Sequence, residues 1–215
     1  MPAQPVYFDL DGTLVDTFPG LFAAVNWLRV AHGLGEADAA QVRGWIGGGI
    51  DALLSGAVPH VDPSRLREPF LEHYVGAPLL SSRPYDGIEA LLDALASRPL
   101  AIVTNKHAQS VERLIEHLGW GDRFAAIVCP HDNVRKPDPE MVERARETAR
   151  IDRADGWFVG DSSFDIETGR GARLRTIAVT WGFRTRDELL SCGPDVVVDS
   201  PAELLQILTA DRIVS

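Results

Sequence analysis

Short apolar runs alternate with segments of helical periodicity along most of this chain. Runs typical of buried strands occur at residues 6–8, 100–103, 125–128, 157–159, 176–179 and 196–198. Segments whose apolar residues recur at helical spacing separate them, at residues 87–97, 108–118, 139–150, 165–172 and 201–208. This alternation predicts an α/β fold with a Rossmann-like parallel sheet that is covered by helices on both faces.

The stretch from about residue 18 to residue 80 breaks this alternation. It contains helical periodicity and no good strand. The apolar residues that fit the first amphipathic helix are Phe22, Val25, Trp27, Leu28 and Val30. We therefore expect an α-helical cap domain over residues 17–80, inserted into an α/β core of residues 1–16 and 81–215.

Composition narrows the class of protein. The formal net charge of −10 and a pI near 5.0 argue against nonspecific binding to nucleic acid or to anionic membranes. The sequence holds no apolar stretch near the ~20 residues that a membrane helix needs. Cys129 and Cys192 form no CxxC pair, so neither a disulfide framework nor a thiolate zinc site is indicated. We expect a cytoplasmic protein.

Two carboxylates follow the first predicted strand. Asp9 and Asp11 lie two residues apart, with no basic residue between them, so their mutual repulsion favours a bound cation. A calcium loop is excluded by spacing, because Thr13 stands where Asp or Asn is needed and Leu14 where Gly must turn. The segment predicts a metal and phosphate site at the carboxyl end of the strand.

Three further polar clusters stand at or near the ends of later strands. They are Thr104-Asn105-Lys106, Arg135-Lys136-Pro137 and the stretch from Gly160 through Asp161 to Asp165. In a parallel sheet these ends converge on one crevice, although the clusters lie far apart in sequence. Together they offer carboxylates for a divalent cation, a hydroxyl and an amide for phosphate oxygens, and an ammonium. Phosphoryl transfer requires this set.

Lysine is rare in this chain. Of 21 basic residues, 19 are Arg, and the two lysines are Lys106 and Lys136. A lysine ammonium is a compact point charge, whereas a guanidinium is a bulky planar group. Lysine at these two places therefore favours a tight site that needs a single ammonium. For Lys106 two interpretations stay open, a cation at the rim of the cleft or a solvated surface charge.

The four clusters, in this order, resemble the four motifs of the haloacid dehalogenase superfamily. The resemblance spans nearly the whole chain, and the predicted helical insertion is similar to the first cap type of that superfamily. The stretches Val42 to Gly49 and Val179 to Phe183 resemble the phosphoglycolate phosphatases. The family's helix after Asp165 usually ends in Gly, where this chain has Arg173, so we expect a shifted helix end.

The resemblance implies a reaction and roles for the acids. Asp9 is expected to be the nucleophile that forms an aspartyl phosphate, and also a magnesium ligand. Asp11 is expected to act as general acid and then general base, and to contact Mg²⁺ through its backbone carbonyl. Asp161 is implied as the remaining magnesium ligand. Asp165 is implied as a direct or water-mediated support of the metal.

The resemblance also implies groups that bind the substrate. Thr104 and Asn105 would hold phosphate oxygens, and Lys136 would pair with Asp9 and the phosphate. Arg43 in the cap is a candidate for a substrate carboxylate, with an exposed helix charge as the equal alternative. The stretch 47–49 would either bring backbone N–H groups to the substrate or serve as a hinge.

The expected activity is a magnesium-dependent phosphatase that acts on a small phosphorylated metabolite, with 2-phosphoglycolate favoured. A pyrophosphatase, a nucleotidase or a broad sugar-phosphate phosphatase stays open. A dehalogenase or phosphonatase is disfavoured because these typically lack the second Asp, which is Asp11 here. A phospho-accepting receiver domain is disfavoured by the inserted block and by the acceptor Asp on the first strand of the chain. The oligomeric state is left as monomer or homodimer.

Overall fold

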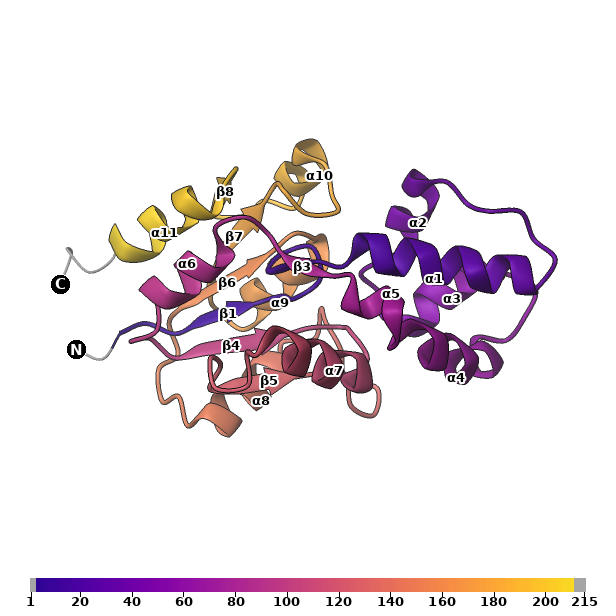
Figure 1. Cartoon of the computed structure of the whole chain (residues 1–215). Coiled ribbons are helices and arrows are strands. Elements are labelled where there is room, and N and C mark those ends of the chain that lie inside the picture. The colour runs from indigo at the N-terminus through magenta and orange to yellow at the C-terminus, as the bar shows by residue number, and fades with distance from the viewer. Residues whose placement is uncertain (1–2, 211–215) are drawn as a thin grey trace.

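The computed structural model describes residues 3–210, and these contain a six-stranded parallel sheet (Figure 1). Its spatial order is β5-β4-β1-β6-β7-β8. The strands are β1 (Val6–Phe8), β4 (Leu100–Val103), β5 (Ala126–Val128), β6 (Trp157–Gly160), β7 (Arg175–Val179) and β8 (Val196–Val198). Each overlaps a predicted apolar run, so the predicted α/β Rossmann-like sheet is confirmed. The first strand of the chain, β1, lies inside the sheet between β4 and β6.

Successive residues of a strand point to opposite faces of the sheet, so these apolar strands present apolar side chains on both faces. Helices cover both faces and bury these side chains. On β1, Val6 and Phe8 belong to one apolar cluster and Tyr7 to another. The first cluster includes residues of α6 (Ile88–Ala94), α7 (Ala108–Leu118) and α11 (Pro201–Ala210). The second includes residues of α8 (Glu140–Ala149), while α9 (Ser163–Gly171) packs against β6 and β7.

Five helices lie between the short strands β2 (Val15–Asp16) and β3 (Arg83–Pro84) in the sequence and form the inserted helical cap. They are α1 (Phe18–Ala31), α2 (Ala39–Trp45), α3 (Ile50–Ala57), α4 (Pro63–Tyr74) and α5 (Ala77–Leu80). Figure 1 shows them grouped beyond the edge of the sheet at which β1 ends, away from both chain termini. The domain limits at residues 17 and 80 stay a prediction.

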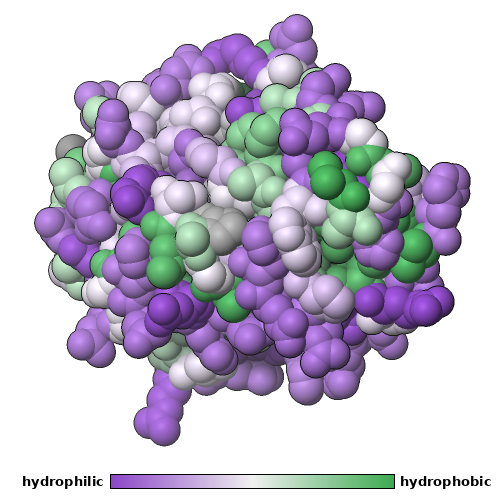
Figure 2. Space-filling view, turned by 45° about the vertical axis from the view of Figure 1, so that its right-hand side comes forward, coloured by the Kyte–Doolittle hydropathy of each residue, from purple (hydrophilic) through white to green (hydrophobic). Residues whose placement is uncertain are grey.

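The face that α1 buries differs from the predicted one. The helix buries Leu21, Val25 and Leu28, but Trp27 is 40% exposed and Val30 is 58% exposed. The prediction that these two residues belong to the apolar face was wrong. The Trp27 ring is stacked on the ring of His73 in α4, with the ring centroids 4.0 Å apart, and it remains partly open to solvent at the edge of that contact. Figure 2 shows one face of the molecule, on which apolar residues occur in separate small patches among mostly hydrophilic residues.

Three short elements were not predicted. The strands β2 (Val15–Asp16) and β3 (Arg83–Pro84) form an antiparallel pair where the chain leaves and re-enters the core. The helix α10 (Arg186–Ser191) begins with a capping box in which Thr185 and Glu188 satisfy each other's backbone N–H groups. Thr185 followed three residues later by Glu188 is a sequence pattern that predicts the start of a helix. None of the helices described within residues 3–210 has the length and apolar character that a bilayer span demands.

The end of α9 corrects one expectation. The helix end is not shifted, because Arg173 itself adopts the left-handed conformation, with φ of 59°. The N–H of Leu174 donates to the carbonyl of Gly169, and that of Arg173 to the carbonyl of Arg170. These bonds close the helix with a Schellman-like turn, and Leu174 is buried next to it. They offset the strain of about 1–2 kcal/mol that a non-glycine residue bears in this conformation.

Candidate active site

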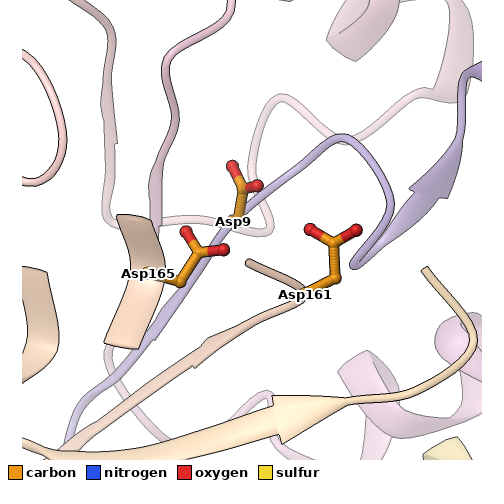
Figure 3. A group of neighbouring side chains, drawn as sticks. All are labelled: Asp9, Asp161 and Asp165. Atoms are coloured by element: carbon orange, nitrogen blue, oxygen red, sulfur yellow. The ribbon is translucent and has the colours of Figure 1, made fainter. Parts of the chain in front are cut away.

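Three buried carboxylates converge at the carboxyl end of the sheet. Asp9 follows β1, Asp161 follows β6, and Asp165 lies in the first turn of α9. One oxygen of each lies within 4.8 Å of the others, and Figure 3 shows the carboxylates turned toward a common space. Parallel strands place their carboxyl ends at one edge of the sheet, which explains why residues about 150 positions apart meet here.

A loop after β7 positions Asp161. The backbone N–H of Phe183 donates to Oδ2 of Asp161 at 2.6 Å. A Cβ on Gly182 would stand 2.3 Å from the same oxygen, so only glycine permits this approach. In the sequence, the stretch Trp181-Gly182-Phe183 indicated only a resemblance to the phosphoglycolate phosphatases. The structure shows that it also holds a carboxylate of the site.

Lys136 provides the positive charge next to two of the acids. Its Nζ lies 2.7 Å from Oδ1 of Asp9 and 2.6 Å from Oδ1 of Asp165, and its side chain is 2% exposed. The other oxygen of Asp165 accepts from the N–H and the Oγ of Ser162 at 2.9 and 2.7 Å. Both oxygens of Asp165 thus already accept hydrogen bonds. Asp161 uses one oxygen to accept from Phe183, and its other carboxylate oxygen can bind a cation.

The electrostatics of this cluster favour a bound cation. Burial, together with the charges of Asp165 and Asp11, raises the pKa of Asp9 to about 7, although Lys136 opposes the shift. Burial and the neighbouring Asp165 and Asp9 raise the pKa of Asp161 well above its usual value. One ammonium does not balance three buried carboxylates. A hard divalent cation with oxygen ligands, such as Mg²⁺, fits the donor set.

Asp11 belongs to a second ion pair, apart from the three-acid cluster. The Nζ of Lys106 lies 2.8 and 3.1 Å from the two oxygens of Asp11 and 2.9 Å from the hydroxyl of Tyr74 in the cap. Burial raises the pKa of Tyr74 to about 12. Although burial opposes the charge of Lys106, Asp11 and Tyr74 raise its pKa above the ordinary lysine value. The solvated interpretation of Lys106 was wrong, since its side chain is 4% exposed.

The amide of Asn105 joins three parts of the site. Its Nδ2 donates to the carbonyls of Gly47 at 3.0 Å and Lys136 at 3.1 Å, and its Oδ1 accepts from the N–H of Lys136 at 2.8 Å. Thr104 Oγ1 accepts from the N–H of Lys106 at 3.2 Å. Both residues line the pocket with the acids. Their contact with phosphate oxygens stays a prediction, and in this arrangement the Asn105 amide is occupied by protein groups.

The cap closes the pocket with different chemistry. Leu21, Ile50, Leu53 and Phe70 line it together with the carboxylates of the core. Arg43 does not line it, because its guanidinium lies 3.9 Å from the ring centre of Phe18 instead. Its proposed contact with a substrate carboxylate therefore lacks support in this geometry.

A second arginine, Arg184, was missed by the sequence analysis. It lines the pocket, and its Nη1 and Nη2 donate to the carbonyls of Arg43 at 2.8 Å and Ile46 at 2.5 Å. It directly follows the Val179 to Phe183 stretch, so that motif was the available signal. Of the stretch 47–49, Gly47 and Gly49 line the pocket, and the carbonyl of Gly47 contacts the core at Asn105.

Comparison with known proteins agrees with this site. The family model described as haloacid dehalogenase-like hydrolase matches residues 6–179. An N-acetylmuramic acid 6-phosphate phosphatase from Pseudomonas aeruginosa is 39% identical over 218 residues, which cover 97% of this chain and 96% of that protein. A phosphoglycolate phosphatase from Agrobacterium fabrum is 37% identical over 218 residues, with 96% and 93% coverage.

A solved structure extends the similarity to the fold. The crystal structure of a predicted phosphoglycolate phosphatase from Haemophilus somnus superposes with a TM-score of 0.87 at 27% identity, covering 96% of this chain and 98% of that one. These findings confirm the predicted enzyme class, a phosphoric monoester hydrolase. The chain belongs to the haloacid dehalogenase-like hydrolase family.

Proposed function

We propose that this protein is a magnesium-dependent phosphatase that hydrolyses a phosphomonoester through an aspartyl phosphate on Asp9. The observation that carries the proposal is the buried cluster of Asp9, Asp161 and Asp165, which is next to Lys136 and opens to the same pocket as Asp11. A nucleophile, a cation site and a proton donor thereby surround one space.

The residues divide the reaction into two steps. A carboxylate oxygen of Asp9 attacks the phosphorus atom, the bond from phosphorus to the ester oxygen breaks, and Asp11 gives its proton to that oxygen. Asp11 then takes a proton from water, whose oxygen attacks the phosphorus and releases inorganic phosphate and free Asp9. The ammonium of Lys136 at 2.7 Å orients Asp9 and offsets the approach of a second anion.

Mg²⁺ would be held by Asp9, by Asp161 and by the backbone carbonyl of Asp11. Asp165 would support it through water, because Lys136 and Ser162 already occupy its two oxygens. When bound, Mg²⁺ supplies charge that lowers the repulsion between the nucleophile and the phosphate. Lys136 keeps its place between Asp9 and Asp165, so that the carboxylates remain oriented during phosphoryl transfer.

Two substrates are candidates. The relatives named N-acetylmuramic acid 6-phosphate phosphatase share 39% and 37% identity with this chain, and those named phosphoglycolate phosphatase share 32–37%. The apolar cap wall around Leu21, Leu53 and Phe70 suits the larger sugar with its methyl groups better than the small 2-phosphoglycolate. We therefore place N-acetylmuramic acid 6-phosphate first and 2-phosphoglycolate second.

The test is phosphate release from a panel of both esters, pyrophosphate, a nucleoside monophosphate and common sugar phosphates, each with Mg²⁺ or with EDTA. We expect hydrolysis of one of the first two with Mg²⁺ and loss of that activity with EDTA. Preferred hydrolysis of pyrophosphate or of the nucleotide would contradict the substrate assignment. No phosphate release from any ester would contradict the proposed function.

A further inference from the structure

The positive groups of the pocket differ in what they already bind. Lys136 contacts the carboxylates of Asp9 and Asp165, and Lys106 contacts the carboxylate of Asp11. Each ammonium is thus neutralised by acids of the site itself. His107 also lines the pocket, and burial lowers the pKa of its imidazole, which disfavours the charged form. Both lysines already contact acids of the site, so an anion on the substrate other than its phosphate would have to compete with those acids.

Arg184 is the exception. Its guanidinium donates to two backbone carbonyls, those of Arg43 and Ile46, which are neutral acceptors. The exposed Glu188 is near enough for the charge of Arg184 to help lower the pKa of that carboxyl, but the two form no ion pair. Within residues 3–210, no acidic side chain forms an ion pair with it. The two bonds also hold the half-buried planar group in place, so little side-chain freedom is lost when it binds a ligand.

Within the described residues, the cap side of the pocket has no group comparable to Arg184. The described cap residues that line the pocket contribute apolar side chains, the Tyr74 hydroxyl and glycine backbone. Arg43 lies over Phe18 at 3.9 Å, outside this lining. An anion on the leaving group would meet either this apolar wall, at a large desolvation cost, or Arg184.

We infer that Arg184 binds a carboxylate on the substrate and so selects phosphomonoesters of acids. The inference rests on the proposed phosphatase function, and it assigns the specificity to a core residue where the sequence had pointed to Arg43. Both candidate substrates fit this class, since each is the phosphate ester of a carboxylic acid. A guanidinium matches a carboxylate with two parallel hydrogen bonds, which gives the geometric basis of the selection.

The test compares each acidic ester with a neutral partner that lacks the acid-bearing group. N-acetylglucosamine 6-phosphate lacks the lactyl group of N-acetylmuramic acid 6-phosphate, and 2-hydroxyethyl phosphate lacks the carboxylate of 2-phosphoglycolate. We expect the wild type to prefer the acidic member in kcat/KM. Arg184→Met should lower kcat/KM for the acidic member about tenfold to a hundredfold and for its neutral partner less than about threefold. Arg184→Lys should restore part of the difference.

A purely structural role of Arg184 gives a different result. If it only ties the cap loop to the core, Arg184→Met lowers both members of a pair equally, and this overturns the inference. Arg43→Met tests the rival residue: a selective loss of the acidic ester in that variant, with Arg184→Met unselective, would transfer the role to Arg43. Equal wild-type rates for both members would also overturn it.

A binding measurement keeps the inference testable apart from turnover. Titration calorimetry of the same pairs with the Asp9→Asn variant, with and without Arg184→Met, needs no hydrolysis. We expect the acidic ester to bind more tightly than its neutral partner, and Arg184→Met to remove that difference. Absent phosphate release by the wild type would mean that the proposed function is wrong. Absent preference in binding would mean that the carboxylate site is wrong.

Discussion

The core and the cap line the same pocket with opposite kinds of groups. The core contributes carboxylates and ammonium groups, and each lysine contacts at least one acid. The cap contributes apolar side chains, the backbone of Gly47 and Gly49, and the hydroxyl of Tyr74. Fixed charges are suited to stabilising a charged transition state, whereas apolar surface selects by shape. Changes of the core acids and lysines should therefore act on kcat, whereas changes in the cap and at Arg184 should act on KM and selectivity.

The largest effect is expected for Asp9→Asn. An amide does not carry the phosphoryl group, so kcat should fall at least about a thousandfold. Phosphate release from the best ester measures this, with circular dichroism to verify that the variant is folded. Turnover close to that of the wild type, in a preparation free of other phosphatases, would show that Asp9 is not the nucleophile. It would then contradict the assignment of the chemical step to the core.

Lys106→Met tests the link between the two regions. It removes the ammonium that contacts Asp11 in the core and Tyr74 in the cap. We expect kcat to fall about tenfold to a hundredfold because Asp11 loses the partner that fixes its position, with KM changed less than about threefold. Tyr74→Phe is the matched variant: it removes the cap hydroxyl alone and should have a smaller effect. An unchanged kcat for Lys106→Met would show that this lysine does not position Asp11.

Gly47→Ala changes the cap without adding or removing a charge. Gly47 has φ of 116°, and a Cβ there would stand 3.4 Å from the Phe164 ring and 3.5 Å from Nη2 of Arg184. The strain should shift the cap loop and raise KM about tenfold, while kcat changes less than about threefold. Steady-state kinetics separate the two constants. Gly44→Ala serves as the control, since a Cβ there meets no heavy atom within 4 Å. A fall in kcat alone would contradict the division between core and cap.

The pH dependence of stability tests the charge excess of the core. The pKa of Asp9 is about 7 in the folded protein, above the value of 3.8 for an ordinary Asp. Between these values the folded state binds more protons than the unfolded state, so the metal-free protein loses stability as pH rises through this window. Mg²⁺ prefers the ionised acids, and its gain in Tm should be larger at about pH 8 than at about pH 5, by at least about 3 °C. Equal gains in scanning fluorimetry would contradict a carboxylate cation site.

Arg173→Gly has the smallest expected effect and leaves both regions of the pocket unchanged. Arg173 is exposed and has φ of 59° at the end of α9. Glycine relieves this strain, so the free energy of unfolding should rise by about 1 kcal/mol with unchanged kinetics. Urea denaturation measures the change, and Arg150→Gly at φ of 52° in the same kind of helix end provides a parallel case. Lower stability would show that the arginine side chain makes a contact worth more than the strain.

The strands and the acids of the site could be predicted because both depend on local patterns. A buried parallel strand requires a short apolar run, and the residue after it lies at the ligand-binding edge whatever the helices between do. Asp9 and Asp161 were found this way, whereas Lys136 was found from its place ahead of a helix and from the rarity of lysine in the chain. The exposed side of α1 could not be found, because Trp27 and Val30 fit an apolar face until the positions of α4 and α5 are known.

Side-chain partners were beyond the sequence for a different reason. The local sequence around Lys106 is compatible both with a solvated charge and with a buried ammonium that links Asp11 to Tyr74. Choosing between them requires the distance from a core loop to a cap helix. The same holds for the carboxylate-binding role proposed for Arg184 in place of Arg43, which depends on which guanidinium reaches the pocket once the cap is packed.

The sequence by itself determined the type of fold, the enzyme class and the order of the acidic and basic motifs. The fold and the motif order follow from periodicity and from residue types at strand ends, which neighbours far along the chain do not alter. The enzyme class follows from the resemblance of those motifs to the haloacid dehalogenase superfamily. The tertiary structure alone decided which charges remain uncompensated and which groups face the leaving group. Those properties depend on contacts between the cap and the core, and such contacts exist only after both have folded and packed.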